Sequence, residues 1–295
     1  ASLPLKNKQP LVTNYEIVSL PSASTLAILR KEFGTRQPAP KTVAVLADPV
    51  FTNSDERYKT LDASKKRIAP TQIAVSAKTR GAEENELNQA ADDFGEVDSV
   101  FNFSRLPFTR KEAEAISMLA PVKDKKLSLG FSANLSNATN PELANYKIIH
   151  FATHSFLNSR RPELSGIVLS LIDEDGKPQN GFLRTDEIYN LNFPAELVVL
   201  SGCRTGLGKE IRGEGLIGLT RGFMYAGAKR VAVSLWDVND EATAELMARF
   251  YKEMLGSKKL SPASALRQAQ LSMSKDKRWS NPYYWAGFIL QGEPR

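Results

Sequence analysis

This chain of 295 residues has a single cysteine, Cys203, and only two histidines, His150 and His154. One cysteine excludes an internal disulfide and a zinc site built from several cysteines, so nothing indicates an oxidising compartment. No apolar run approaches the roughly 20 residues that a membrane-spanning helix needs, and the first residues lack the apolar core of a signal peptide. We expect a cytoplasmic protein that is not bound to membranes.

The chain also lacks a concentrated patch of one charge. Its formal net charge is +6, from 39 basic and 33 acidic residues. The basic side chains are scattered among acidic ones, as in Lys111-Glu112, and no nucleic-acid recognition motif accompanies them. We therefore expect a solvated basic surface and no nucleic-acid partner.

Short β-branched apolar runs alternate with helical patterns along most of the chain. Strands are expected at 15–20, 42–47, 147–154, 166–171, 197–203, 230–236 and 284–290. Helices are expected around Leu26 to Phe33, from a Thr109 cap through Leu119, at 184–191, around Leu216 to Phe223, from an Asn239 or Asp240 cap through Met254, and from Pro262 onward. This alternation predicts an α/β fold whose sheet is mostly parallel and covered by helices on both faces.

A polar stretch interrupts that pattern between about residues 52 and 98. It is rich in Lys, Asp, Glu, Ser and Ala, which is typical of a long surface insertion. We divide the chain into an N-terminal part, 1–105, which contains this insertion, and a catalytic part, 106–295. The first part is either the beginning of one larger sheet or a small lobe of its own.

Two of the predicted strands end on residues that can do nucleophilic chemistry. The run Lys147–His154 ends on a histidine, and the run that begins at Leu197 reaches Cys203. Neighbouring parallel strands present their carboxyl ends at one edge of a sheet, where α/β proteins place their chemistry. The expected site is a cysteine–histidine dyad, with His154 as general base and Cys203 as nucleophile, 49 positions apart.

Other interpretations of these residues are weaker. A lone cysteine is often a buried core residue, but Gly206 and Gly208 follow Cys203 and permit a sharp turn and close approach of substrate. His150 and His154 have the spacing of two zinc ligands on a helix, but Phe151 replaces the glutamate of that motif and the run favours a strand. We predict no metal and no cofactor, and a core role for His150.

Acyl transfer also needs donors for an oxyanion and a pocket for the substrate side chain. The backbone N–H groups of Ser155 and Cys203 are the expected oxyanion donors. Asp237 follows the next strand, so its carboxylate is the candidate for pairing with a substrate arginine, and Trp236 and Ser201 are expected beside it. The alternative is that Asp237, Asn239 and Asp240 only cap a helix.

Several segments together resemble the CHAT domain family, which is related to caspases and separases and is often fused to tetratricopeptide repeats. The resemblance lies in 150–154, 200–206, 214–215, 226–228, 234–237 and 282–288. It implies a caspase-like fold and a cysteine endopeptidase that cleaves a protein substrate. The likeness of 234–237 to a separase segment adds a preference for arginine before the cut bond.

Two departures from the family pattern bear on function. Ser155 stands where many relatives have a glycine after the histidine, and the chain has no tetratricopeptide repeat. A regulatory partner or repeat region is therefore expected outside this chain. Two other functions stay open, namely transfer of the acyl group to an amine and a silent or latent scaffold for protein–protein interaction.

Overall fold

The computed structural model describes residues 3, 9–20, 27, 30–31, 33, 36–60, 103–156, 165–202 and 214–294, with the backbone alone at 214–217. Cys203 lies outside these residues, as do most of the helix expected around Leu26 and most of the polar insertion. None of the described helices is long and apolar enough to cross a membrane.

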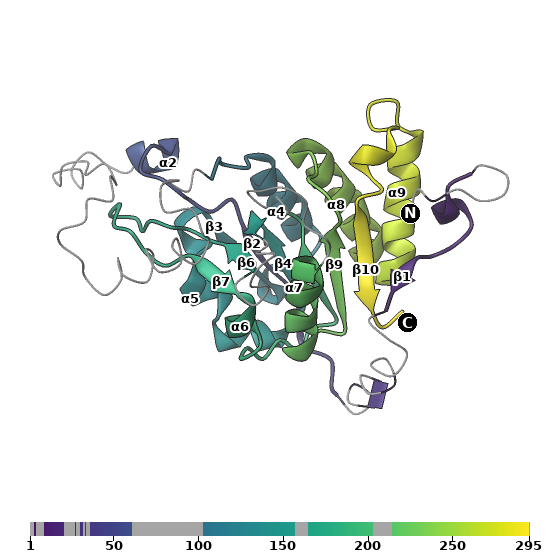
Figure 1. Ribbon diagram of the computed structural model, residues 1–295, viewed down its shortest axis with the longest axis horizontal. Coiled ribbons are helices and arrows are strands. Elements are labelled where there is room, and N and C mark those ends of the chain that lie inside the picture. Colours follow the sequence, from purple (N-terminus) through teal and green to yellow (C-terminus); the bar gives the residue numbers. More distant parts are fainter. Residues whose placement is uncertain are drawn as a thin grey trace.

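A seven-stranded sheet forms the centre of the described part (Figure 1). In spatial order its strands are β1 (Val18–Ser19), β10 (Phe288–Gly292), β9 (Arg230–Ser234), β8 (Leu197–Leu200), β4 (Tyr146–Ala152), β2 (Lys41–Ala47) and β3 (Lys125–Leu129). Only the β10–β9 pair is antiparallel. The predicted α/β fold with a mostly parallel sheet is confirmed. β1 and β2 come from the first 105 residues and belong to this same sheet; the division of the chain at residue 105 stays a prediction.

Helices cover both faces of the sheet, because successive strand residues point to opposite sides. In β2, Val43 and Val45 pack in one apolar cluster and Ala44 and Leu46 in another. The first face is covered by α4 (Phe108–Met118), α8 (Asp240–Leu255) and α9 (Pro262–Lys275), and the second by α5 (Leu135–Ala138), α6 (Thr185–Ile188) and α7 (Glu214–Tyr225).

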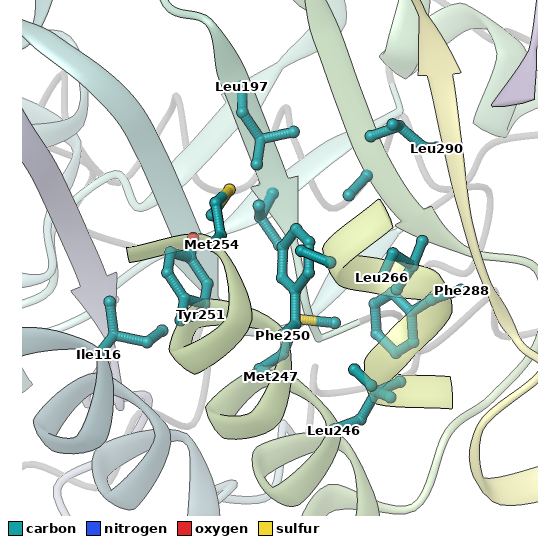
Figure 2. Packing of buried hydrophobic residues seen from close by; sticks show 14 of the residues in the cluster. Ile116, Leu197, Leu246, Met247, Phe250, Tyr251, Met254, Leu266, Phe288 and Leu290 are labelled. Atoms are coloured by element: carbon teal, nitrogen blue, oxygen red, sulfur yellow. The ribbon is translucent and has the colours of Figure 1, made fainter. Parts of the chain in front are cut away.

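α8 contributes several large side chains to the first of these clusters. Figure 2 shows Phe250, Tyr251 and Met254 directed from this helix toward the sheet, with Leu197 of β8 above them and Ile116 of α4 at their side. All are buried, as the spacing of Phe250 and Met254 predicted. α4 packs against α8, and the chain before α4 contacts His154.

Two strands differ from their expected form. Residues 166–171 were expected as the next strand of the main sheet. Instead β6 (Gly166–Val168) lies between β5 (Ser155–Phe156) and β7 (Phe182–Arg184) in a separate antiparallel sheet. Only two residues, 153 and 154, separate the end of β4 from the start of β5, and an antiparallel pair needs no long crossover. The last strand begins at Phe288, because 282–284 form a 3₁₀ helix.

One expected helix cap is wrong and another is confirmed. α4 begins at Phe108, and the Thr109 hydroxyl donates to the Leu106 carbonyl instead of capping the helix. The Phe108 N–H donates to the carboxylate of Asp240, 3.0 Å away, in α8. Asn239 caps α8 by accepting from Ala242 N–H at 2.9 Å. Asp240, the first residue of α8, therefore accepts a hydrogen bond from the first residue of α4.

The remaining described elements are short connections. They are α2 (Glu56–Lys59) and the 3₁₀ helices at Leu11–Thr13, Val122–Asp124, Gly130–Ser132, Pro141–Asn145 and Pro282–Tyr284. Only α2 and the residues beside it belong to the predicted insertion, and Arg57 of α2 packs against the end of β2. The described beginning of the insertion is thus tied to the sheet.

Candidate functional site

Of the residues that the sequence singled out, those that the structure describes lie at or beside one edge of the sheet. β9, β8, β4 and β2 are parallel neighbours, so their carboxyl ends meet at that edge. Trp236 follows β9, Gly202 follows β8, His154 follows β4 and Asp48 follows β2. Trp236 and His154 were predicted as site residues, and the strand order places the ends of all four strands at the same edge.

His154 is held from several sides. It is 1% exposed, and its Nε2 lies 2.7 Å from the backbone oxygen of Ser104. The rings of Phe51 and Phe103 have their centroids 5.3 and 5.5 Å from the imidazole. A carbonyl oxygen can only accept, so Nε2 carries the proton of this bond, and Nδ1 is the basic nitrogen of the neutral ring.

The chain comes into close contact where β8 and β4 end. The Ser201 N–H donates to the Phe151 carbonyl at 2.9 Å, which continues the strand pairing beyond Leu200. A Cβ at Gly202 would lie 2.0 Å from the Thr153 carbonyl oxygen, a distance that no side chain allows. Gly202 and Thr153 are therefore in backbone contact, and each is one residue before a member of the predicted dyad.

The Ser155 N–H does not point toward the partner strand β6. Val168 N–H donates to the His154 carbonyl at 2.9 Å. In an antiparallel ladder this makes Ser155 and Ile167 a pair whose N–H groups point away from each other. The Ser155 N–H is thus directed away from β6.

Asp48 is the main charged residue of this edge. It is 1% exposed and has a φ of 52°, in the left-handed region that aspartate tolerates better than most residues. Its carboxylate lies within 2.9 Å of the guanidinium groups of Arg57, Arg105 and Arg110. Since Arg105 is next to Ser104, this ion-pair cluster holds the carbonyl that supports His154.

A small cavity adjoins the His154 support. It has a volume of about 180 Å³ and is lined by Phe51, Thr52, Ser54, Asp55, Phe103, Ser104 and Arg105. The Asp55 carboxylate is paired with Arg57 at 2.6 Å. Its pKa is lowered: burial acts to raise it, and the hydrogen bonds from Arg57 more than offset that effect. The Asp55 carboxylate is therefore ionised and paired with Arg57.

The other end of the site is exposed. Leu235 is 47% exposed, Asp237 is exposed and Trp236 is half-buried. The Trp236 indole N–H donates to the Tyr283 carbonyl at 3.1 Å. Ser201, by contrast, is 1% exposed, and its Oγ has no hydrogen-bond partner among the described residues. The three residues expected around a substrate side chain thus differ sharply in accessibility.

His150 has the core role that the sequence predicted. It is fully buried, with Nδ1 2.9 Å from the Tyr251 hydroxyl and Nε2 2.8 Å from Glu112 Oε1, the latter without the alignment of a hydrogen bond. Burial, and then the charge of Glu112, raise the pKa of Tyr251 well above its usual value. This group joins β4 to α4 and α8 beneath the site.

Asp240 is a second buried acid near this group. Burial raises the pKa of its carboxyl to about 6; the bond from Phe108 N–H opposes that shift, and the charges of Glu112 and Asp48 add to it. No cluster of three or more His, Cys, Asp or Glu suited to a metal ion occurs in the described ranges.

The fold is α/β, with a mostly parallel sheet that helices cover on both faces. The chain belongs to the CHAT domain family: a model of that family matches residues 1–293. Curated relatives include Tetratricopeptide repeat protein 28 of Homo sapiens, 37% identical over 114 residues, and of Mus musculus, 36% identical over 110 residues. These matches cover 39% and 37% of this chain and 4% of each relative, so the chain spans a small fraction of their length.

A solved structure shares the fold. A chain of the Saccharomyces cerevisiae separase–securin complex at 3.0 Å resolution aligns with 98% of this chain and 14% of its own length, with a TM-score of 0.50 and 13% identity. A chain of that complex at 2.6 Å resolution gives a TM-score of 0.48 and 14% identity, over 98% of this chain and 15% of its own. At such identities the likeness concerns the fold alone.

Sequence reasoning missed three contributors to the site. The backbone carbonyl of Ser104 accepts from His154, and because any residue has such a carbonyl, the sequence gives no signal for it. Asp48 gave no signal in the sequence, because its arginine partners are up to 62 positions away. Gly202 had a usable signal, a glycine directly before the candidate nucleophile, which is typical of close backbone approach.

Proposed function

We propose that this chain is a cysteine endopeptidase that cuts protein substrates with a His154–Cys203 dyad. One observation carries the proposal, the backbone contact between Gly202 and Thr153. Each of these residues directly precedes a member of the dyad, so the contact brings the chain before Cys203 to the chain before His154. Membership of the CHAT domain family supports the same chemistry.

The reaction begins with a proton transfer. His154 Nδ1 takes the proton of the Cys203 thiol, while the Ser104 carbonyl keeps the Nε2 proton in place. The thiolate attacks the substrate carbonyl carbon, and the carbonyl electron pair moves to oxygen. The backbone N–H groups of Ser155 and Cys203 stabilise this oxyanion. The orientation of the Ser155 N–H, away from β6, supports that role.

The intermediate then collapses in two stages. His154 returns its proton to the leaving amine as the carbon–nitrogen bond breaks, which leaves a thioester on Cys203. Water, deprotonated by His154, attacks this thioester and releases the carboxylate product and the thiol. No metal or cofactor enters either stage.

We further propose that the substrate has arginine before the cut bond. Asp237 is an exposed acid at the carboxyl end of β9, beside the strand that leads to Cys203. A carboxylate there pairs with a guanidinium through two parallel hydrogen bonds. Trp236 and Ser201 would flank the side chain, and the unpartnered Ser201 Oγ offers one more acceptor.

The test compares wild type with Cys203→Ala and His154→Ala on a positional-scanning peptide library. We expect cleavage after arginine in wild type and a loss of about a thousandfold or more in either variant, as when a nucleophile or its base is removed. Thermal melts check that the variants stay folded. Cleavage that persists in Cys203→Ala contradicts the dyad. Unchanged cleavage after arginine in Asp237→Ala contradicts the specificity assignment alone.

A second candidate function, a latent or silent scaffold, is favoured by the burial of His154. Its side chain is 1% exposed beneath Phe51 and Phe103, so access to substrate requires a change at this end of the site. The named relatives are tetratricopeptide repeat proteins, and we propose that a repeat region outside the described residues drives this change. A chain that binds such a partner but neither cleaves peptides nor reacts with an arginyl chloromethyl ketone would be a scaffold.

A further inference from the structure

The segment 282–288, which is part of the family pattern, has no role in the proposed chemistry. It lies against the loop that carries Asp237. The Trp236 indole N–H donates to the Tyr283 carbonyl at 3.1 Å, and the Tyr283 hydroxyl donates to the Asp237 carbonyl at 2.8 Å. Two hydrogen bonds in opposite directions thus join residues that are about 47 positions apart.

Gly287 brings the two segments still closer. A Cβ at this position would lie 3.0 Å from Cε2 of the Trp236 indole. The Leu235 N–H donates to the Gly287 carbonyl at 2.9 Å, directly after the β9–β10 pairing of Ser234 with Phe288. The loop therefore rests on 282–288 along its length.

The segment is itself fixed to the core. Trp285 is 2% exposed, and the buried Gln270 of α9 donates from Nε2 to the carbonyls of Trp285 and Phe288, at 3.0 Å each. Tyr283, in contrast, is 46% exposed, so its ring lies at the surface beside Asp237. A rigid base thus presents one hydroxyl to the backbone of the exposed acid.

We infer that Tyr283 is a positioning residue for substrate selection: its hydroxyl fixes the main chain of Asp237 and so sets where the carboxylate meets a substrate guanidinium. This inference rests on the proposed function of Asp237. A guanidinium needs both oxygens of the carboxylate in one plane, whereas a lysine ammonium is a point charge on a flexible stem. Tyr283 therefore acts on the preference for arginine over lysine more than on basic residues in general.

The chain offers a matched pair of variants for the test. Tyr283→Phe removes the hydroxyl that donates to the Asp237 carbonyl, and keeps the ring and the carbonyl that accepts from Trp236. Tyr284→Phe removes a neighbouring hydroxyl that makes no hydrogen bond within the described part of the chain. The readout is kcat/KM for two fluorogenic peptides that differ only in Arg or Lys before the cut bond.

We expect the Arg-to-Lys ratio to fall about threefold to tenfold in Tyr283→Phe, the effect of one lost hydrogen bond. The ratio should stay at the wild-type value in Tyr284→Phe. An unchanged ratio in Tyr283→Phe, or an equal fall in both variants, overturns the inference.

A binding measurement separates this inference from the proposed function. In the Cys203→Ala background, fluorescence anisotropy gives the Kd values of the same two peptides with and without Tyr283→Phe. If wild type turns over neither peptide, the isolated chain is not an active endopeptidase, while the Kd ratio still judges Tyr283. A fall of about threefold or more in Arg preference supports the inference. Equal binding of both peptides to the parent, or an unchanged ratio in the variant, overturns it.

Discussion

The two ends of the candidate site are built differently. At the His154 end, the imidazole and Asp48 are each 1% exposed, and three arginines and two phenylalanines enclose them. At the Asp237 end, Leu235 and Tyr283 are 47% and 46% exposed, and the loop is held by hydrogen bonds at the surface.

This difference separates two tasks. A histidine base has to keep one nitrogen protonated and the other directed at the nucleophile. The residues around it are therefore buried and hold it through several contacts at once. An acid that selects a substrate side chain has to be reachable by that side chain, so it lies at the surface. Substitutions at the His154 end should therefore affect stability and all substrates together, and those at the Asp237 end should change selection at constant stability.

Asp48→Asn should lower the free energy of unfolding most, because Asp48 lies at the more buried end of the site. The substitution leaves three guanidinium groups around an uncharged side chain, and removal of one partner from a buried ion pair costs about 3–5 kcal/mol. The arginines are between 17% and 35% exposed, so we expect about 3 kcal/mol in urea unfolding.

Glu142→Gln is the control for Asp48→Asn. Glu142 pairs with Lys41 and Lys126, but its side chain is 41% exposed, and such surface pairs contribute about 1 kcal/mol or less. Equal losses of unfolding free energy in the two variants would contradict the claim that the buried ion pairs of Asp48 stabilise the fold more than exposed pairs do.

Gly202→Ala ranks second. Its Cβ would stand 2.0 Å from the Thr153 carbonyl, so the ends of β8 and β4 must move apart, at a cost of about 1–3 kcal/mol. Peptidase activity should fall for arginine and lysine substrates alike, because the dyad acts on every substrate.

Gly222→Ala of α7 is the control. The nearest atom to its added Cβ would be Thr185 Cγ2 at 3.3 Å, and the free energy of unfolding should change by no more than about 1 kcal/mol. A Gly202→Ala enzyme with wild-type activity would remove the main support for the dyad.

Asp240→Asn tests the link between α8 and the chain that supports His154. The folded pKa of Asp240, about 6, lies above its ordinary 3.8, so the native state binds more protons between these values. This contribution to stability is present below pH 3.8 and is lost as the pH rises through 6.

The full shift corresponds to about 3 kcal/mol, and partial exposure of the carboxyl reduces our expectation to about 1.5 kcal/mol. The free energy of unfolding of wild type, measured from pH 4 to 7, should fall by that much relative to Asp240→Asn, whose amide oxygen still accepts from Phe108 N–H. Parallel pH curves would show that Asp240 is not the titrating group.

Gly287→Ala should have the smallest effect on stability and tests the exposed end. The added methyl group meets the Trp236 indole at 3.0 Å, and that half-buried ring can give way, so we expect less than about 1 kcal/mol in unfolding. The Arg-to-Lys ratio should nevertheless change by about twofold or more, since Asp237 follows Trp236. A loss of stability as large as that of Gly202→Ala would contradict the contrast between the two ends.

The elements of this fold could largely be predicted, because periodicity reports local burial. The strands that end near His154 and Cys203, and the α8 face with Phe250 and Met254, follow directly from it. Periodicity does not say which strands pair, so β6 was placed in the wrong sheet. The Asp48 ion pairs and the Tyr283 bond join distant parts of the chain, and only the folded structure brings them together.

The account depends most directly on a reactive Cys203 that is activated by His154. Labelling with a biotinylated arginyl chloromethyl ketone, followed by mass-spectrometric mapping, tests both residues in one assay. The account predicts an adduct on Cys203 in wild type, a much slower reaction in His154→Ala, and little labelling by the aspartyl analogue. Equal labelling of wild type and His154→Ala, or no adduct on Cys203 even with its regulatory partner present, would contradict it.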